Sequence, residues 1–331
     1  NQSHQRFDHY QYADQTLIDG TSSQATGALP GGIEDGVDSE KVSNVGYNAK
    51  AGVAWDLAEN GKVFVNAGYY SRQPYHDNIY LNYTNQVNPL TSNETILGLE
   101  AGYSYSSPNF SANVNAYRTN WADRVVTSFN VQNDVVTFTT NEGVEQLHQG
   151  IEWDFDWKPQ PDVPYTLTGF LSMGDWKYVG EALSRVTDED QNVISTSSSD
   201  VDGGEVGDAA QFSAGMGIDW QVAERLSMDS DVRFYDNLYA DVGAVKENLK
   251  VPSYHVVDWG MSYKMYVGDE GNSLNVRVNI NNLLDRVYIN ELRTNIAAGD
   301  GNGVLWNGVD TANQGYFGLG RTWNVGLRYR F

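Results

Sequence analysis

Every second side chain between Arg321 and the terminal Phe331 is apolar, and the residues between them are polar or glycine. Successive side chains of a β-strand point to opposite faces, so this stretch would have one wholly apolar face and one polar face. A membrane-spanning strand needs this division, because one face meets lipid and the other meets a polar interior. A soluble β-sandwich strand alternates in the same way, with its apolar face buried. The apolar residues are Trp323, Val325, Leu327, Tyr329 and Phe331.

The same two-residue period recurs along the chain. No charged residue falls on the apolar phase of these segments, whereas the interleaved phase carries many. The pattern predicts an all-β protein built from antiparallel strands. Alternation alone does not choose between lipid and a second sheet as the cover of the apolar face. Besides the terminal stretch, the segments are 45–57, 63–69, 97–105, 110–116, 151–157, 165–173, 212–220, 226–234, 257–265 and 274–280.

The connections between the segments favour lipid. Short and long links alternate without exception, as in a membrane barrel with short turns at one rim and long loops at the other. A Greek-key sandwich has no reason to alternate in this way. We therefore expect an antiparallel transmembrane β-barrel of about twelve strands, counting a weaker first strand at 5–16. The short links are 58–61, 106–109, 158–164, 222–225 and 267–272; the long ones are 17–43, 71–94, 117–150, 178–208, 236–253 and 286–320.

Two strands are predicted to be longer than a bilayer requires. Residues 117–131 and 134–150 would continue beyond the membrane. They would meet in a turn at 132–134, whose Gln-Asn-Asp sequence suits a turn.

Composition excludes several classes of protein. The chain has 43 acidic and 21 basic residues, and its net charge of −22 would repel nucleic-acid phosphates, so no nucleic-acid partner is expected. It has no cysteine, which removes disulfides, thiol catalysis and thiolate metal sites. None of its five histidines lies in a nucleophile motif, so no enzyme activity and no cofactor are expected.

Three stretches carry a family resemblance. Residues 278–288 (VNINNLLDRVY) resemble the penultimate strand of TonB-dependent outer-membrane receptors, and residues 320–331 (GRTWNVGLRYRF) resemble their last strand. Residues 71–74 (SRQP) resemble a weaker Arg-x-Pro signature of the same family. The resemblance implies a barrel of about 22 strands around a plug, located in the bacterial outer membrane. Residues 1–331 would then be the carboxy-terminal half of this barrel, without the plug domain and the first strands.

The resemblance also implies a function. Such receptors import a scarce nutrient (a ferric siderophore or similar chelate, a corrinoid or an oligosaccharide) that long extracellular loops capture. The implied partners are the energy-coupling protein TonB, reached through a missing amino-terminal segment, and outer-membrane lipid and lipopolysaccharide. The barrel assembly machinery would read the terminal aromatic signal of Trp323, Tyr329 and Phe331. The alternative is a self-contained porin-like or adhesin barrel of about twelve strands.

Two loops supply candidate ligand-binding residues. Rigid aromatic rings and guanidinium groups suit a flat ligand, a sugar ring or a siderophore. The tyrosines could instead pack loop against loop, and the glycine-rich last loop could be a mobile cover. The candidates are Tyr70, Arg72, Tyr75, His76, Tyr80 and Tyr83 in the first loop, with Arg293 and Trp306 in the last.

Acidic side chains gather in two further places, and we assign a metal to neither. Residues 185–208 are rich in Asp and Glu, but their spacing matches no calcium-binding loop, so we expect a solvated acidic loop. Glu152, Asp154 and Asp156 occupy alternate positions of one strand. We expect them to face the interior, paired with Arg or Lys or hydrated.

Overall fold

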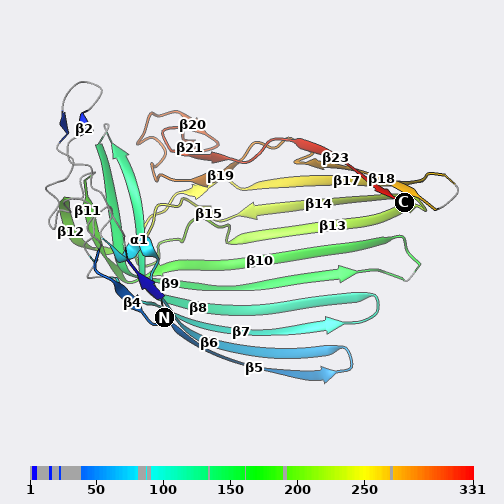
Figure 1. Cartoon of the computed structure of the whole chain (residues 1–331), viewed down its shortest axis with the longest axis horizontal. Helices are drawn as coiled ribbons and strands as arrows, with labels where there is room; N and C mark the ends of the chain where they lie inside the picture. The colour runs from blue at the N-terminus through cyan, green and yellow to red at the C-terminus, as the bar shows by residue number, and fades with distance from the viewer. Residues whose placement is uncertain are drawn as a thin grey trace.

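One large antiparallel sheet dominates the computed structural model (Figure 1). It describes residues 2–5, 15–16, 22–23, 39–80, 87, 91–132, 135–160, 162–188, 192–268 and 271–331. The sheet has thirteen strands, eleven of which follow one another along a single path. They are β5 (Tyr47–Ala58), β6 (Gly61–Arg72), β7 (Glu94–Ser106), β8 (Phe110–Gln132), β9 (Val135–Trp157), β10 (Tyr165–Val179), β13 (Phe212–Ala223), β14 (Leu226–Asp236), β17 (Tyr254–Tyr266), β18 (Ser273–Asn281) and β23 (Thr322–Arg330).

These eleven strands correspond one to one to the eleven segments predicted from the two-residue period. The predicted alternation of links is also confirmed, because the tight links join strands at one end of the sheet and the long ones at the other (Figure 1). We call these ends the short-turn rim and the long-loop rim. The predicted first strand, 5–16, lies largely outside the described residues. Only its last two residues belong to a described strand, β2 (Gln15–Thr16).

The long hairpin was also predicted correctly. Strands β8 and β9 have 23 residues each and extend past their neighbours at the long-loop rim. Most of the predicted turn at 132–134 lies outside the described residues. The stretch 178–208 differs from expectation, because it contains a hairpin of β11 (Glu181–Thr187) and β12 (Val193–Asp200) whose first strand pairs with β9.

Short elements fill the remaining connections. The first long loop contains one turn of helix, α1 (His76–Ile79). No helix among the described residues is both long and apolar enough to cross a membrane. The two-stranded pairs are β1 (Gln2–His4) with β4 (Val42–Asn44), β2 with β3 (Ser22–Ser23), β15 (Leu238–Tyr239) with β16 (Lys250–Val251), β19 (Ile289–Leu292) with β22 (Gly315–Phe317), and β20 (Leu305–Trp306) with β21 (Val309–Asp310).

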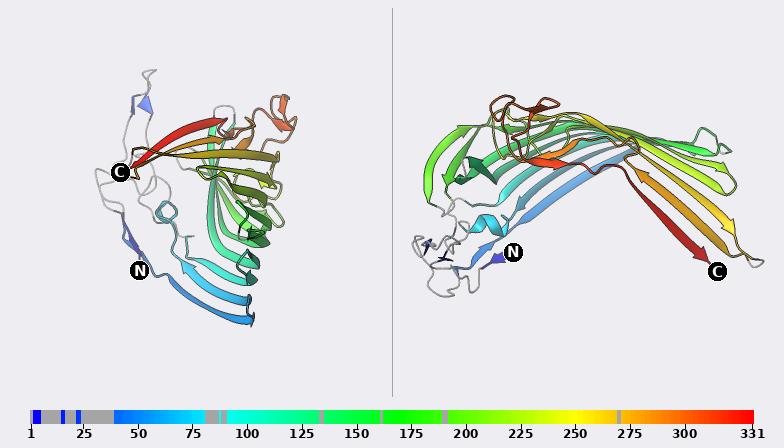
Figure 2. Two further views of the ribbon diagram at one scale, coloured as in Figure 1. Left: turned by 90° about the vertical axis from the view of Figure 1, so that its right-hand side faces the viewer. Right: turned by 90° about the horizontal axis from the view of Figure 1, so that it is seen from above.

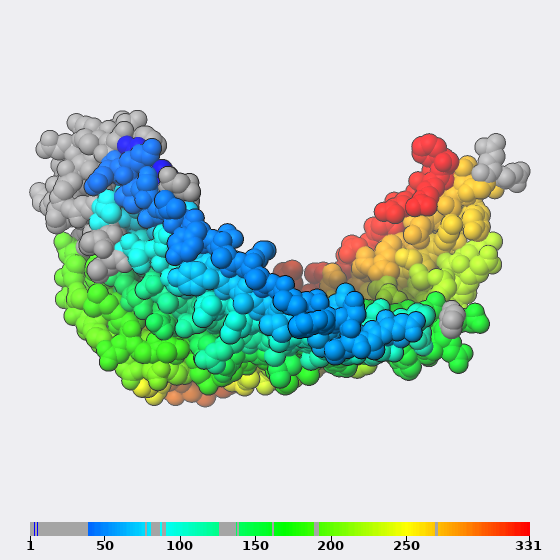
Figure 3. Space-filling view, turned by 90° about the horizontal axis from the view of Figure 1, so that it is seen from below, coloured from blue at the N-terminus to red at the C-terminus, as the bar shows by residue number. Residues whose placement is uncertain are grey.

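The sheet is a single curved wall. It bends into an open trough, with β5 at one margin and β23 at the other (Figures 2 and 3). The right-handed twist of adjacent strands accumulates over many strands and gives a wide sheet such curvature.

The predicted apolar phase is bare along this wall. Val53 is 56 % exposed, Trp220 44 % and Leu327 70 %. The second sheet of a sandwich would have buried these side chains. A large apolar face of this kind is not stable in water, and its uniform apolar character fits contact with lipid hydrocarbon.

The dry core lies among the loops instead. Leu238, Val251, Ile289 and Leu292 form a buried cluster at the long-loop rim, together with Ala240, Tyr254, Val256 and Val309. A second cluster under the β11–β12 hairpin contains Val144, Tyr178, Ala182, Val201, Val206 and Ala244.

The opposite face of the wall, here called the inner face, carries the polar phase. Two groups of its charges are paired within the sheet: Arg277 Nη2 donates to Asp229 Oδ2 at 2.9 Å, and Arg233 pairs with Asp231 and Asp258. Two carboxylates of β9 have amide partners rather than cationic ones among the described residues. Asn113 donates to Asp154 at 2.9 Å, and Asn115 donates to Glu152 at 3.4 Å.

Candidate ligand-binding site

A groove of about 900 Å³ lies on the inner face of β5 to β10. It extends from the middle of the wall toward the long-loop rim. Most of its lining side chains occupy the polar phase, so strand alternation aims them at one space. They include Lys50, Asn66, Tyr70, Ile96, Glu100, Asn115, Tyr117, Thr119, Trp121, His148, Glu152 and Trp176.

A row of rings forms one wall of the groove. Register places Trp176 opposite His148, and their rings stack with centroids 5.2 Å apart and planes 13° from parallel. The Trp121 ring centroid lies 6.3 Å from that of His148 on the other side. Trp176 Nε1 donates a hydrogen bond of 2.8 Å to the Tyr117 hydroxyl, which fixes the indole. Such a row gives a flat guest a rigid stacking surface.

Two guanidinium groups close the outer end of this row. Arg72 Nη2 lies 2.6 Å from Glu94 Oε2, and Arg124 Nε lies 3.6 Å from Glu94 Oε1. Glu94 is only 4 % exposed, so one buried carboxylate is shared by two cations and a positive charge remains. Arg72 and Arg124 also lie over the Trp121 ring, at 5.4 and 5.1 Å from its centroid.

A break in strand register brings Arg124 to this place. The pairing of β8 with β9 shifts between Trp121 and Arg124, and Asp123 within the shift has a φ of 60°. An extra residue of this kind re-aims the side chains that follow it. Arg124 therefore shares a side with Trp121, although strict alternation would place it on the opposite face.

The first-loop candidates divide between the groove and the loop packing. Tyr70 lines the groove, and Arg72 stacks on Tyr75 with its guanidinium carbon 4.8 Å from the ring centroid. His76 packs edge-on against Tyr80, at 5.5 Å between centroids. Tyr80 is buried and its hydroxyl donates to the Glu40 carbonyl at 2.8 Å, a position that suits loop packing rather than ligand contact. Tyr83 lies outside the described residues.

The last-loop candidates do not line the groove. Arg293 pairs with Glu291, and its guanidinium lies 5.9 Å from the Tyr316 ring centroid. Trp306 packs edge-on against Phe317 at 5.3 Å. The structure therefore does not bring Arg293 and Trp306 together with Tyr70 and Arg72.

Sequence reasoning did not select the ring row. Tyr117, Trp121, His148 and Trp176 were not among the candidates. The available signal was a set of aromatic residues on the phase that otherwise carries charge. Their convergence depends on register across three strands, which a sequence pattern does not specify.

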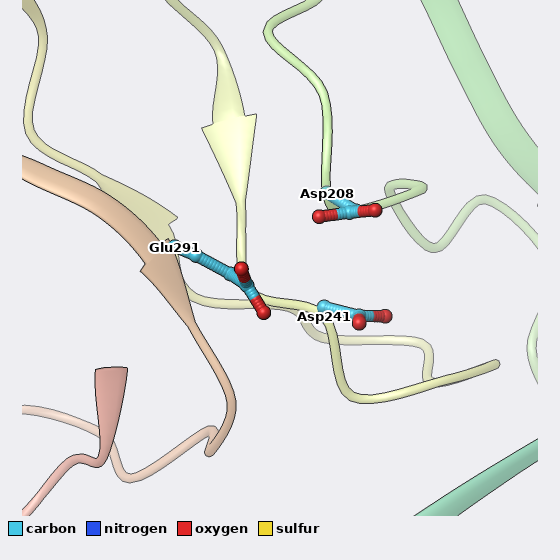
Figure 4. Close-up of side chains that lie close together, drawn as sticks. All are labelled: Asp208, Asp241 and Glu291. Atoms are coloured by element: carbon cyan, nitrogen blue, oxygen red, sulfur yellow. The ribbon is translucent and has the colours of Figure 1, made fainter. Parts of the chain in front are cut away.

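Three carboxylates converge among the loops, from separate parts of the chain (Figure 4). Asp208 precedes β13, Asp241 follows β15, and Glu291 lies on β19. Partial desolvation raises the pKa of Asp208 and of Asp241, and Arg293 opposes the effect at Asp241. We assign no metal to this group, because Arg293 already neutralises Glu291 and the two aspartates are exposed.

The proposed assembly residues occupy the bare apolar face. Trp323, Tyr329 and Phe331 are all exposed, and the first two lie on β23 with their rings on the same side as Leu327.

An antiparallel wall with a bare apolar face, a polar inner face and loops packed at one rim defines a membrane β-barrel protein. Within that class the chain belongs to the TonB-dependent receptor family, because residues 5–283 match the family described as "TonB dependent receptor-like, beta-barrel". This confirms the resemblance and the fold class predicted from sequence. The family consists of outer-membrane transport receptors that interact with TonB, and not of enzymes.

Solved structures show the same fold at low sequence identity. The copper transporter OprC superposes with a TM-score of 0.60 at 16 % identity, over 88 % of this chain and 41 % of its own. The siderophore receptor PiuA from Acinetobacter baumannii superposes with a TM-score of 0.57 at 17 % identity, over 88 % of this chain and 36 % of its own. The ferric-catecholate import receptor Fiu from E. coli K12 superposes with a TM-score of 0.54 at 15 % identity, over 94 % of this chain and 37 % of its own. The chain thus spans about two fifths of the length of these structures. No curated protein sequence matches it significantly.

Proposed function

We propose that the chain forms the carboxy-terminal half of a receptor barrel in the bacterial outer membrane, and that this receptor imports a scarce nutrient past a plug. Family membership and the receptor-like wall support the proposal. The similar structures include proteins named for copper, siderophore and ferric-catecholate transport, which supports a metal chelate as cargo. Residues 1–331 contribute the wall and the loops, and the plug belongs to a part of the receptor outside this chain.

The cargo is a flat anionic chelate of the ferric siderophore class. The observation that carries this is the ring row of Trp121, His148 and Trp176 under two guanidiniums that share one carboxylate. Rings stack on aromatic ligand groups, and the uncompensated cation attracts an anion. A neutral oligosaccharide could use the rings but not the charge. The overall net charge of −22 opposes an anion only weakly here, because salt screens charges beyond about 8 Å.

The partners follow from this function. TonB supplies energy through an amino-terminal segment of the receptor outside this chain. The barrel assembly machinery reads Trp323, Tyr329 and Phe331, and lipid with lipopolysaccharide covers the bare face.

Removal of one ring tests the groove. We expect Trp176→Ala to weaken the binding of a ferric catecholate about tenfold, measured by quenching of tryptophan fluorescence, and to slow growth on that chelate as the only iron source. Trp306→Ala is the matched control, because it removes an equal ring that does not line the groove. Unchanged binding in Trp176→Ala would refute the groove, and a loss confined to Trp306→Ala would place the cargo in the last loop.

A further inference from the structure

A second hollow, of about 280 Å³, lies on the inner face at the short-turn rim, well away from the groove. Four cationic side chains line it: Arg225, Lys264, Arg328 and Arg330. Glu224 is the one carboxylate among the described residues of its lining. Such a concentration of positive charge is unexpected in a chain with a net charge of −22. The other lining residues are hydroxyl or amide donors, namely Gln221, Ser227, Ser262, Ser273 and Asn275.

These four cations form no ion pair within the part of the chain that the structure describes. Arg225 and Lys264 instead lie over the Tyr266 ring, at 4.8 and 4.9 Å from its centroid. The cations deeper in the same strands behave differently, since Arg277 and Arg233 are each bound to aspartates. Among the described residues of this part of the wall, cations without an ion pair are therefore confined to the rim.

Strand register arranges the cations in a broad row. Lys264 lies opposite Asn275, which in turn lies opposite Arg328 on the next strand. Arg330 follows Arg328 on the same face and lies opposite Ser273. Two strand spacings separate the backbones of Lys264 and Arg328, a distance of about 10 Å.

The breadth and exposure of the row decide between possible occupants. A single phosphate is too small to span about 10 Å, and none of the four cations is buried as in a closed ion site. Lipid head groups lie on the other side of the wall, where Leu327 and Tyr329 point. A polypeptide with several carboxylates has both the length and the charge that this row requires.

We propose that the row, which we call the cationic rim, is a docking surface for an acidic polypeptide segment that lies inside the barrel at its periplasmic end. Carboxylates of this segment pair with Lys264, Arg328 and Arg330, while Ser262 and Asn275 donate further hydrogen bonds. The inference depends on the inner orientation of the polar phase and not on the identity of the cargo. Failure of the groove test therefore leaves it intact.

Because the chain has no cysteine, a single introduced thiol can report on the cationic rim. The full chain is folded into detergent micelles with an environment-sensitive dye on Asn275→Cys, and hexaglutamate peptide is titrated in. We expect a saturable fluorescence change that weakens with added salt, since salt screens exposed charges. A dye on Ser111→Cys, on the inner face of β8 opposite Asp156, should not respond.

Removal of charge completes the test. In the labelled chain, Lys264→Gln with Arg328→Gln should weaken peptide binding about tenfold. Lys62→Gln with Lys250→Gln removes the same charge away from both the cationic rim and the groove, and should leave binding unchanged. Arg225→Gln, which lies in a turn and perturbs no strand, serves as a second variant if the first pair folds poorly. Equal losses in both pairs, or a response to inorganic phosphate or phosphatidylglycerol vesicles but not to the peptide, would overturn the proposal.

Discussion

Glu94 lies at the outer end of the ring row, where its buried carboxylate holds two guanidiniums together. We expect Glu94→Gln to lower the free energy of unfolding by about 1–3 kcal/mol, because Arg72 and Arg124 would then repel each other without compensation. Urea unfolding monitored by tryptophan fluorescence measures this change. Glu100→Gln is the control, since Glu100 accepts hydrogen bonds from Asn66 and Asn115 and pairs with no cation among the residues that the structure describes. An equal effect of both substitutions would contradict the shared-carboxylate account.

A second residue organises the last long loop, residues 286–320. Asp310 is buried, and backbone hydrogen bonds, above all from Ala312, hold its pKa below the usual value. Because the folded pKa is lowered, its stabilisation is present above the unfolded pKa and is lost as the pH falls through the folded pKa. Its carboxylate accepts hydrogen bonds from the backbone N–H groups of Gly299, Asn302, Gly303 and Ala312.

The measurement for Asp310 is amide hydrogen exchange in residues 299–312. We expect faster exchange below the folded pKa, after correction for the intrinsic pH dependence, and fast exchange at neutral pH in Asp310→Asn. Asp300→Asn is the control, because the Asp300 side chain is exposed and organises no such set of donors. A loop equally protected in Asp310→Asn would show that other contacts hold it.

At the scale of the element, the two faces of a strand should tolerate a new charge very differently. Val276 and Asn275 are neighbours on β18, but Val276 lies on the apolar phase and Asn275 on the inner face. We expect Val276→Arg to cost roughly 2–4 kcal/mol near the bilayer midplane. Asn275→Asp should be tolerated, because its carboxylate would lie between Lys264 and Arg328. The yield of folded, heat-modifiable protein in membranes distinguishes them. Equal yields would mean that hydrocarbon does not cover the apolar phase.

Sequence periodicity predicted the strands well because each strand of the wall has one uniform face. Val53, Trp220 and Leu327 meet a single solvent, so their period is visible without tertiary information. The β11–β12 hairpin was missed, since strand β12 is largely exposed on both faces and has no alternation to detect. The groove was found only in part: Tyr70 and Arg72 were selected from loop composition, whereas Trp121 and Trp176 required the register between strands.

The whole molecule separates its membrane wall from its dry core, which lies among the loops. Leu292→Ala should therefore loosen the loops by about 2–4 kcal/mol while the barrel still assembles. Limited proteolysis of intact cells would detect the loosened loops, and heat-modifiable mobility would report the barrel. Leu305→Ala, at a loop position that is 51 % exposed, should change neither. Loss of the barrel in Leu292→Ala would show that the loops and the wall fold as one unit.

In the receptor that we propose, the carboxylates of β9 would also affect movement along the pore. Glu152, Asp154 and Asp156 occupy alternate positions between the groove and the short-turn rim, about 6.7 Å apart along the strand. The amides that donate to Glu152 and Asp154 carry no positive charge to offset these carboxylates. An anion that moved along this side of the pore would be repelled by these carboxylates before it reached the positive charges of the cationic rim. Energy supplied from the inner membrane would overcome this repulsion, and a neutral cargo would need less of that energy.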